Sequence, residues 1–186
     1  MITLVIGGPG SGKSIAAEEM VCKIKAENRY YLATMMVYDK DGADRIEKHR
    51  KQREGKGFIT LELPYRIDRA LGMMDKPQNS VVLLECISNL VGNEMYENAE
   101  RSWLCKPDSL NEEAFVDEVM SDIKTLSKGV RDIVIVTNEY EPSDQTDEMT
   151  RIYIKLIDLI NEKLIGSADL VMDVRKTDRG SKREDF

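Results

Sequence analysis

Residues 2–14 read ITLVIGGPGSGKS, and this stretch indicates the fold of the whole chain. Its apolar start, Ile2–Ile6, is typical of a short buried parallel strand. The part that follows fits G-x-x-x-x-G-K-[ST], a phosphate-binding loop (P-loop) that lies between a strand and a helix. In such a loop, backbone N–H groups and the helix start attract phosphate, Lys13 adds a charge, and Ser14 offers a hydroxyl to Mg²⁺. A glycine-rich turn without a ligand is the alternative. The predicted nucleotide contacts are Gly7, Gly8, Pro9, Gly10, Ser11, Gly12, Lys13 and Ser14.

Strands and helices alternate along the rest of the chain. The further predicted strands cover residues 30–34, 58–63, 80–85, 132–137 and 168–174. The predicted helices cover residues 14–26, 41–54, 67–74, 88–98, 111–127 and 146–164. This alternation predicts a doubly wound α/β fold with a mostly parallel sheet of the P-loop NTPase type. We expect a single nucleotide-binding domain over residues 1–174, with a loop at 99–110 and a charged, mobile tail at 175–186.

The composition excludes several classes of function. The 186 residues are 41% hydrophobic and 33% charged, and 27 basic against 34 acidic residues give a net charge of −7. A protein with this balance has no global basic field for nucleic acid. No stretch approaches the ~20 apolar residues of a membrane helix, so we expect no membrane insertion. The start MITLVIGG does not resemble a signal peptide, and three cysteines are a poor disulfide framework, so we expect a cytoplasmic protein.

Two further side chains are candidates for chemistry beside the loop. Glu85 ends the most apolar predicted strand, where a P-loop site needs a second Mg²⁺ ligand; a surface carboxylate is the alternative. His49 is the only histidine and lies within DRIEKHRKQR, residues 44–53. On a helix, Arg45, His49 and Arg53 share one face. Cations around an imidazole favour its neutral, nucleophilic form and also attract phosphates. The composition alone is more typical of a solvated charged helix.

Taken in order, these segments resemble the adenosylcobinamide kinase / adenosylcobinamide-phosphate guanylyltransferase family of cobalamin biosynthesis. The most specific element is Arg-Ile-x-x-His-Arg-x-x-Arg at residues 45–53, because the P-loop alone is common to many NTPases. The other matches, within residues 2 to about 174, are Ala17-Glu18, Tyr31-Leu32-Ala33-Thr34, Thr60 with Glu62, Leu83-Leu84-Glu85-Cys86-Ile87 with Asn93, Val136-Thr137-Asn138-Glu139, and Asn161 followed by Ala168-Asp169.

The resemblance implies a bifunctional transferase with one nucleotide site. The kinase reaction phosphorylates the aminopropanol hydroxyl of adenosylcobinamide. The second reaction transfers GMP from GTP to adenosylcobinamide phosphate through a guanylyl-histidine, which divides one difficult displacement into two. By this resemblance His49 is the guanylylated nucleophile, Mg²⁺ with GTP and/or ATP is required, and the partner molecule is a corrinoid. The family also implies a homo-oligomer, a trimer.

The family's binding residues carry over to matching positions in this chain. The implied metal ligands are Ser14 and Glu85. For Glu62 the alternative is an exposed acid at a strand end, and for the asparagines it is a cap of a strand or helix. The nucleotide contacts implied beyond the P-loop are Ala33, Thr34, Met35, Arg50, Lys51, Gln52, Arg53, Glu62 and Glu85. The residues implied to line the site are Arg45, Asn93, Asn138 and Glu139.

The chain departs from the family pattern at two places. Residues 140–148, YEPSDQTDE, replace a glycine-rich run, and Gly10 stands where the loop commonly has arginine. The first departure affects corrinoid binding or subunit packing rather than the nucleotide half. Two other functions therefore stay open from the sequence. One is a P-loop kinase for another small alcohol, and the other is a nucleotide-binding paralogue without catalysis.

Overall fold

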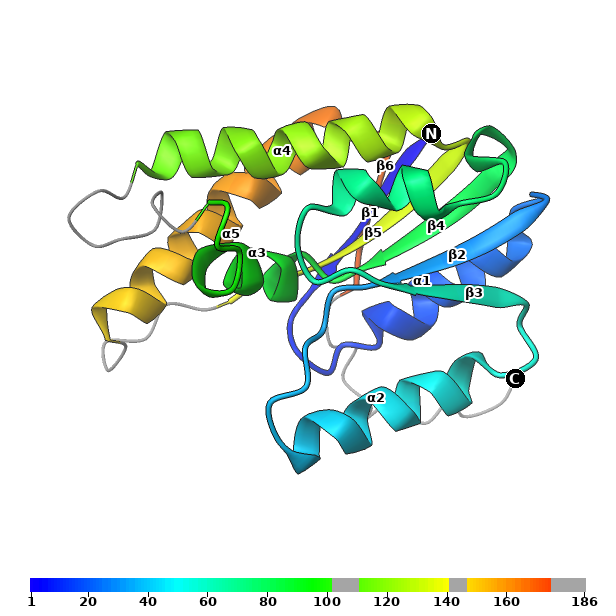
Figure 1. Ribbon diagram of the computed structural model, residues 1–186, viewed down its shortest axis with the longest axis horizontal. Helices are drawn as coiled ribbons and strands as arrows, with labels where there is room; N and C mark the ends of the chain where they lie inside the picture. Colours follow the sequence, from blue (N-terminus) through cyan, green and yellow to red (C-terminus); the bar gives the residue numbers. More distant parts are fainter. Residues whose placement is uncertain (102–110, 141–146, 175–186) are drawn as a thin grey trace, which may run out of the picture.

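A computed structural model describes residues 1–101, 111–140 and 147–174 of the chain (Figure 1). They form a six-stranded sheet in the order β3-β2-β4-β5-β1-β6, and every pairing in it is parallel. The predicted doubly wound, single-domain α/β fold is thus confirmed. The tail at 175–186 and most of the predicted loop, 102–110, lie outside the described residues. The strands are β1 (Ile2–Gly7), β2 (Asn28–Ala33), β3 (Phe58–Glu62), β4 (Ser80–Glu85), β5 (Asp132–Asn138) and β6 (Leu170–Asp173).

Helices cover both faces of the sheet because the central strands bury side chains on both sides. Alternate residues of β4 enter different cores: Val82 and Leu84 pack under α3, α4 and α5, whereas Val81 and Leu83 pack toward α1. Figure 1 shows α2 on the same side as α1. The helices are α1 (Lys13–Lys23), α2 (Lys40–Arg53), α3 (Ile87–Tyr96), α4 (Glu112–Gly129) and α5 (Glu148–Ser167), with short 3-10 helices η1 (Ile67–Met73) and η2 (Pro77–Asn79).

The ends of several helices differ from the prediction. Helix α1 ends three residues before the predicted Ala26, because Ile24 is extended and leads the chain back toward β2. The predicted helix at 67–74 is the 3-10 helix η1, and α5 runs to Ser167, three residues past its predicted end. The predicted cap of α4 is confirmed, since the Asn111 side chain accepts a hydrogen bond from the Ala114 N–H over 3.0 Å. Among the described helices, none combines the length and apolar character needed to cross a membrane.

The topology brings the predicted site residues to one edge of the sheet. All strands run the same way, so their carboxyl ends meet at that edge, where parallel sheets bind ligands. The loop after β1 carries the P-loop, and Gly10 and Gly12 adopt φ values of 73° and 88°, which side-chain-bearing residues rarely adopt. Gly7 has no room for a larger residue, since an added Cβ would lie 2.3 Å from the Val174 carbonyl oxygen.

Candidate nucleotide and transfer site

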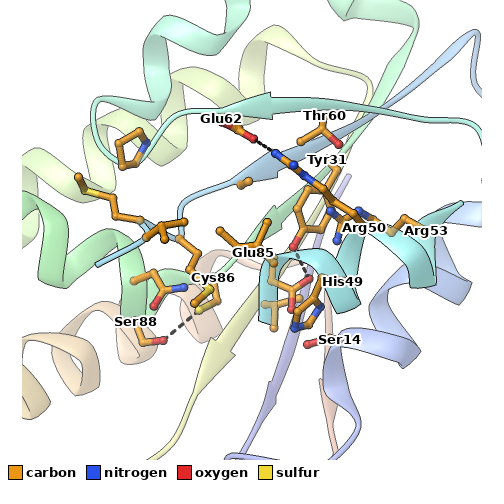
Figure 2. A pocket seen from close by; sticks show the side chains of 18 of the residues that line it. Ser14, Tyr31, His49, Arg50, Arg53, Thr60, Glu62, Glu85, Cys86 and Ser88 are labelled. Atoms are coloured by element: carbon orange, nitrogen blue, oxygen red, sulfur yellow. Dashed lines mark hydrogen bonds and ion pairs between the residues drawn. The ribbon is translucent and has the colours of Figure 1, made fainter. Parts of the chain in front are cut away.

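A cavity of about 890 Å³ opens at the carboxyl edge of the sheet, between the P-loop, the ends of β2, β4 and β5, and helix α2. This volume is in the range that proteins use for small-molecule ligands. Figure 2 shows the side chains that line it, drawn from elements far apart in the chain. Of the predicted site residues, those that line the cavity are Pro9, Gly10, Lys13, Ser14, Ala33, Met35, His49, Arg50, Arg53, Glu62, Glu85 and Asn138.

The P-loop presents its lysine and serine to this cavity. Lys13 is 8% exposed, and its Nζ donates to the Gly8 carbonyl oxygen over 3.1 Å. Burial lowers the pKa of Lys13, and the nearby Glu85 carboxylate opposes part of that shift. A bound phosphate would give the Lys13 ammonium a charged partner in addition to this carbonyl. The loop residues Gly7, Gly8, Ser11 and Gly12 lie outside the cavity lining.

Helix α2 carries the histidine segment across the mouth of the cavity. It starts at an Asp39 side chain that accepts a hydrogen bond from the Gly42 N–H over 2.7 Å. Toward its end, Arg50 forms an ion pair with Glu62 of β3. The Arg53 guanidinium lies 3.4 Å from the centre of the Tyr31 ring, a cation–π contact. Through Arg50 and Arg53, these contacts hold α2 against the ends of β3 and β2.

The remaining predicted residues of α2 have different environments. Lys51 pairs over 2.6 Å with Glu47, which lines the cavity, whereas Lys51 itself does not. The Gln52 Nε2 is buried and has no hydrogen-bond partner. Arg45 lies in α2, but its side chain is outside the described structure. The structure therefore brings Arg50 and Arg53 into the cavity wall and leaves Lys51 and Gln52 out of it.

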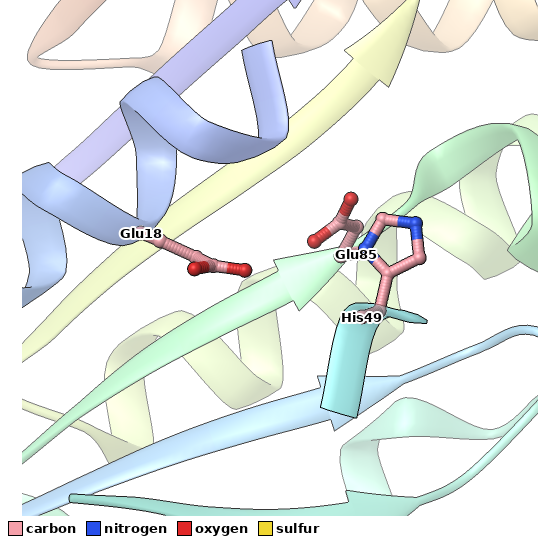
Figure 3. A group of neighbouring side chains, drawn as sticks. All are labelled: Glu18, His49 and Glu85. Atoms are coloured by element: carbon pink, nitrogen blue, oxygen red, sulfur yellow. The ribbon is translucent and has the colours of Figure 1, made fainter. Parts of the chain in front are cut away.

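Two carboxylates that were not predicted as neighbours lie close to His49. The sequence predicted an imidazole beside Arg45, Arg50 and Arg53, and the side chain of Arg45 lies outside the described structure. Donor atoms of His49, Glu18 and Glu85 all lie within 4.8 Å of one another (Figure 3). Arg50 and Arg53 interact with Glu62 and the Tyr31 ring instead. The imidazole Nδ1 is buried and has no hydrogen-bond partner.

Glu18 is the principal residue that the sequence reasoning missed. It lies on α1, is fully buried, and receives a 2.7 Å hydrogen bond at Oε2 from Lys56, while its Oε1 has no partner. The signal was its position, four residues after Ser14 in a predicted helix, which places both side chains on one face. A buried carboxylate one turn beyond a P-loop is directed toward the ligand site.

The end of β4 is organised by a small hydrogen-bond network. The Thr34 hydroxyl donates to the Glu85 carbonyl oxygen over 2.9 Å and accepts from the Cys86 N–H over 2.8 Å. Asn93 donates to the carbonyl oxygens of Thr34 and Pro64 over 2.6 and 3.0 Å. Thr34 and Asn93, both predicted at the site, therefore lie behind the cavity wall and support it.

The end of β5 lies at the far side of the cavity. Asn138 lines it and donates through Nδ2 to the Ser88 hydroxyl and to the Tyr140 hydroxyl over 3.3 Å. Glu139 is exposed and does not line the cavity. Ser88 and Tyr140 line it too and were not predicted. Tyr140 begins the divergent segment, of which residues 141–146 lie outside the described structure.

Comparisons with known proteins identify the family of the chain and agree with its fold. The profile of the cobinamide kinase / cobinamide phosphate guanyltransferase family matches residues 3–176. The bifunctional adenosylcobalamin biosynthesis protein CobU of Escherichia coli (strain K12) is 32% identical over 143 residues, 75% of each chain. The flagellar accessory protein FlaH of Methanocaldococcus jannaschii matches in structure with a TM-score of 0.52, over 92% of this chain and 70% of its own, at 12% identity. The last likeness concerns the fold alone.

Proposed function

This chain belongs to the cobinamide kinase / cobinamide phosphate guanyltransferase family of cobalamin biosynthesis, and we propose that one cavity serves both reactions, with His49 taking up GMP. The observation that carries the proposal is the position of His49 on α2, in the wall of the cavity that also contains Lys13, Ser14 and Glu85. A P-loop alone supports phosphoryl transfer. A histidine in the same cavity adds a nucleophile for a second group transfer.

The kinase reaction uses the P-loop half of the cavity. The corrinoid hydroxyl attacks the γ-phosphorus of a nucleoside triphosphate, a new O–P bond forms, and the bond to the bridging oxygen of the nucleoside diphosphate breaks. The hydroxyl proton leaves with the attack. Backbone N–H groups of the P-loop, to which Pro9 contributes none, and the Lys13 ammonium would hold the phosphates and offset their charge. The protein thus contributes positioning and electrostatics to this step.

The guanylyltransferase reaction uses the histidine half. The unprotonated imidazole nitrogen of His49 attacks the α-phosphorus of GTP, a P–N bond forms, and pyrophosphate leaves. A phosphate oxygen of cobinamide phosphate then attacks the same phosphorus, breaks the P–N bond and restores the imidazole. The product contains a new pyrophosphate linkage between GMP and the corrinoid. Arg50 and Arg53, in the same wall, would compensate the charge on the phosphates.

The residues present suit a magnesium ion bound with the nucleotide. Ser14 offers a hydroxyl and Glu85 a carboxylate, both line the cavity, and oxygen donors are what Mg²⁺ prefers. When bound, Mg²⁺ neutralises phosphate charge. Glu85 is held in place independently of any ion, because the Tyr31 hydroxyl donates to its Oε2 over 3.1 Å.

The nucleotide contacts remain proposals that geometry supports to different degrees. Glu62 and Arg50 lie together at the cavity and would reach the guanine or the ribose. Ala33 and Met35 line the cavity beside the end of β2. Lys51 and Gln52 would need α2 to rotate before they touch the nucleotide. The corrinoid would lie toward Asn138 and Tyr140, where this chain departs from the family.

The assembly of the protein is a part of the proposal that rests on family likeness. By this likeness the protein is a homo-oligomer, a trimer, and the mass of the purified protein in solution tests this. The cytoplasmic location remains a prediction from the sparse cysteines, of which Cys22 and Cys86 carry free thiols. Burial raises the pKa of the Cys86 thiol, so this group at the cavity wall stays protonated rather than forming a reactive thiolate.

A product analysis separates the two reactions. Cobinamide is incubated with GTP, Mg²⁺ and the protein, and the corrinoid products are resolved by chromatography. We expect cobinamide phosphate followed by GDP-cobinamide, and we expect His49→Ala to stop at cobinamide phosphate. Accumulation of the phosphate alone with the unaltered protein would favour a kinase without GMP transfer. No product at all, with nucleotide still bound, would favour a paralogue without catalysis.

A further inference from the structure

The cluster of Glu18, His49 and Glu85 has features of a metal site, in addition to the roles proposed above for His49 and Glu85 (Figure 3). Among the described residues, it is the one group in which three histidine, cysteine or carboxylate ligands converge, with donor atoms within 4.8 Å of one another. Four-coordinate ligands about 2.1 Å from a zinc ion lie about 3.4 Å apart, so a side-chain movement of roughly 1 Å would complete the contact.

Unpartnered buried donor atoms give a second, independent indication of a ligand. Glu18 is fully buried, yet its Oε1 has no hydrogen-bond partner. The His49 Nδ1 is also buried and unpartnered. Leaving such groups buried without a partner is unfavourable, most of all for a charged carboxylate, so folded proteins rarely do so without a reason. A cation between these atoms would satisfy both.

Neighbouring side chains orient the two carboxylates in the way that outer groups orient metal ligands. The Lys56 ammonium donates to Glu18 Oε2 over 2.7 Å, and the Tyr31 hydroxyl donates to Glu85 Oε2 over 3.1 Å. In each carboxylate, Oε2 therefore accepts a hydrogen bond from a side chain that is not itself a member of the cluster. Such contacts fix the ligand geometry before an ion arrives.

We propose that Glu18, His49 and Glu85 bind one divalent transition-metal cation of the Zn²⁺ or Co²⁺ class when the cavity holds no nucleotide. An imidazole with two carboxylates suits these ions, whereas Mg²⁺ prefers oxygen ligands in an octahedral arrangement. The site differs from the nucleotide Mg²⁺ site of Ser14 and Glu85, but the two share Glu85. They therefore compete, and each excludes the other.

Binding has a consequence that rests on the proposed role of His49. A neutral imidazole has one unprotonated nitrogen, and a metal on that nitrogen leaves no lone pair to attack phosphorus. The cation would therefore keep the enzyme from taking up GMP until it is removed or displaced. We expect Zn²⁺ to slow formation of the GMP adduct in competition with GTP, and a chelator to restore it.

Metal binding is measured directly, without turnover. Untagged full-length protein is stripped with a chelator, dialysed and titrated with Co²⁺ while its visible absorption is recorded; Zn²⁺ is then added to displace the Co²⁺. We expect one equivalent with the absorption of a low-coordinate nitrogen–oxygen site. Glu18→Gln and His49→Ala should each weaken binding at least about tenfold. Glu19→Gln, a change at the neighbouring exposed carboxylate, should leave it unchanged.

A further variant distinguishes coordination from packing. Glu18→Gln also loses the ion pair with Lys56, which helps to hold the segment after α2 against α1. Lys56→Ala removes this orienting contact but keeps the carboxylate ligand, so it should bind Co²⁺ more weakly and still reach the same absorption at saturation. Equal loss of Co²⁺ binding in Glu18→Gln and Lys56→Ala would overturn the proposal. So would a Co²⁺ absorption that survives both Glu18→Gln and His49→Ala. An absorption band from a thiolate bound to cobalt, or no absorption band at all, would overturn it too. Because no GTP is used, failure here leaves the proposed guanylyltransferase reaction untouched.

Discussion

The Tyr31 hydroxyl donates a hydrogen bond to Oε2 of Glu85 over 3.1 Å, across the pairing of β2 with β4. The same tyrosine ring lies under the Arg53 guanidinium, 3.4 Å from its centre. Burial raises the pKa of Tyr31, and the Glu85 charge raises it further, so the hydroxyl remains a donor throughout the physiological range. The Tyr31 side chain thus positions both the Glu85 carboxylate beside the P-loop and the Arg53 guanidinium of α2.

We expect Tyr31→Phe to slow both reactions, because Glu85 loses its donor while Arg53 keeps its aromatic partner. A hydrogen bond to a charged group of this kind contributes on the order of 1.5 kcal/mol, so kcat should fall roughly tenfold. The measurement is steady-state kinetics of each reaction. Tyr30→Phe is the matched control, because its hydroxyl bonds to the Asp75 backbone on the other face of the sheet. Equal losses in both variants would contradict a specific role for Tyr31.

Glu62 should matter for nucleotide recognition and little for stability. Its ion pair with Arg50 is exposed, with 67% and 59% of the two side chains accessible, and exposed pairs contribute little to folding. Glu62→Gln should therefore leave the melting temperature nearly unchanged and raise KM for GTP several-fold. Glu27→Gln is the control, since Glu27 forms an equally exposed pair with Lys76 away from the cavity. An unchanged KM would remove Glu62 from the nucleotide contacts.

The pH dependence of nucleotide binding should report on Lys13. Burial lowers its pKa in the protein alone, and bound phosphates would raise that pKa again. At a pH between the lowered pKa of the free protein and the higher pKa of the complex, nucleotide binding is accompanied by uptake of a proton at Lys13. The affinity for nucleotide should therefore fall as the pH rises through the lowered pKa. Calorimetry with ATP near pH 9, in two buffers of different ionisation enthalpy, measures this uptake. Lys13→Arg should abolish this proton uptake. A binding heat of the unaltered protein that is the same in both buffers would contradict the prediction.

A buried ion-pair cluster away from the cavity should affect stability alone. Arg101 is 7% exposed and contacts the Asp122 carboxylate over 2.8 and 3.0 Å and Glu94 over 3.3 Å. Arg101→Met removes the cation that lies nearest to both carboxylates and leaves them Arg66 and Asn98 as partners, so the free energy of unfolding should drop by about 3 kcal/mol. Arg69→Met, which breaks an exposed pair, should cost far less. Denaturant unfolding measures both, and GMP transfer well below the melting temperature should be unaffected.

The sequence predicted the fold well because the fold depends on local patterns. Short apolar runs identified the strands, and ITLVIGGPGSGKS identified the first βα unit with its loop. Helix ends were less accurate. The end of α1 depends on where the chain must turn to reach β2, which is a tertiary constraint rather than a property of residues 24–26.

The candidate site was only partly predictable, because tertiary contacts rather than local sequence patterns decide which side chains meet. His49, Glu85 and the P-loop carry chemistry in their residue types, so they were found. Glu18 is one of two adjacent acids on α1 and was matched to the family without a role, and its burial against Lys56 distinguishes it from Glu19. The partners of Arg50 and Arg53 on β3 and β2 were not predicted, because the helix pattern alone does not reveal them.

The most direct test of the account is the intact mass of the protein after incubation with GTP and Mg²⁺, kept at neutral to alkaline pH because a P–N bond is acid-labile. We predict a gain of one GMP, seen with GTP, missing in His49→Ala, and retained in Lys48→Ala, a change at the exposed neighbour on α2. No adduct on the unaltered protein while it still binds nucleotide, or an adduct that survives His49→Ala, would contradict the assignment of His49 as the residue that carries GMP.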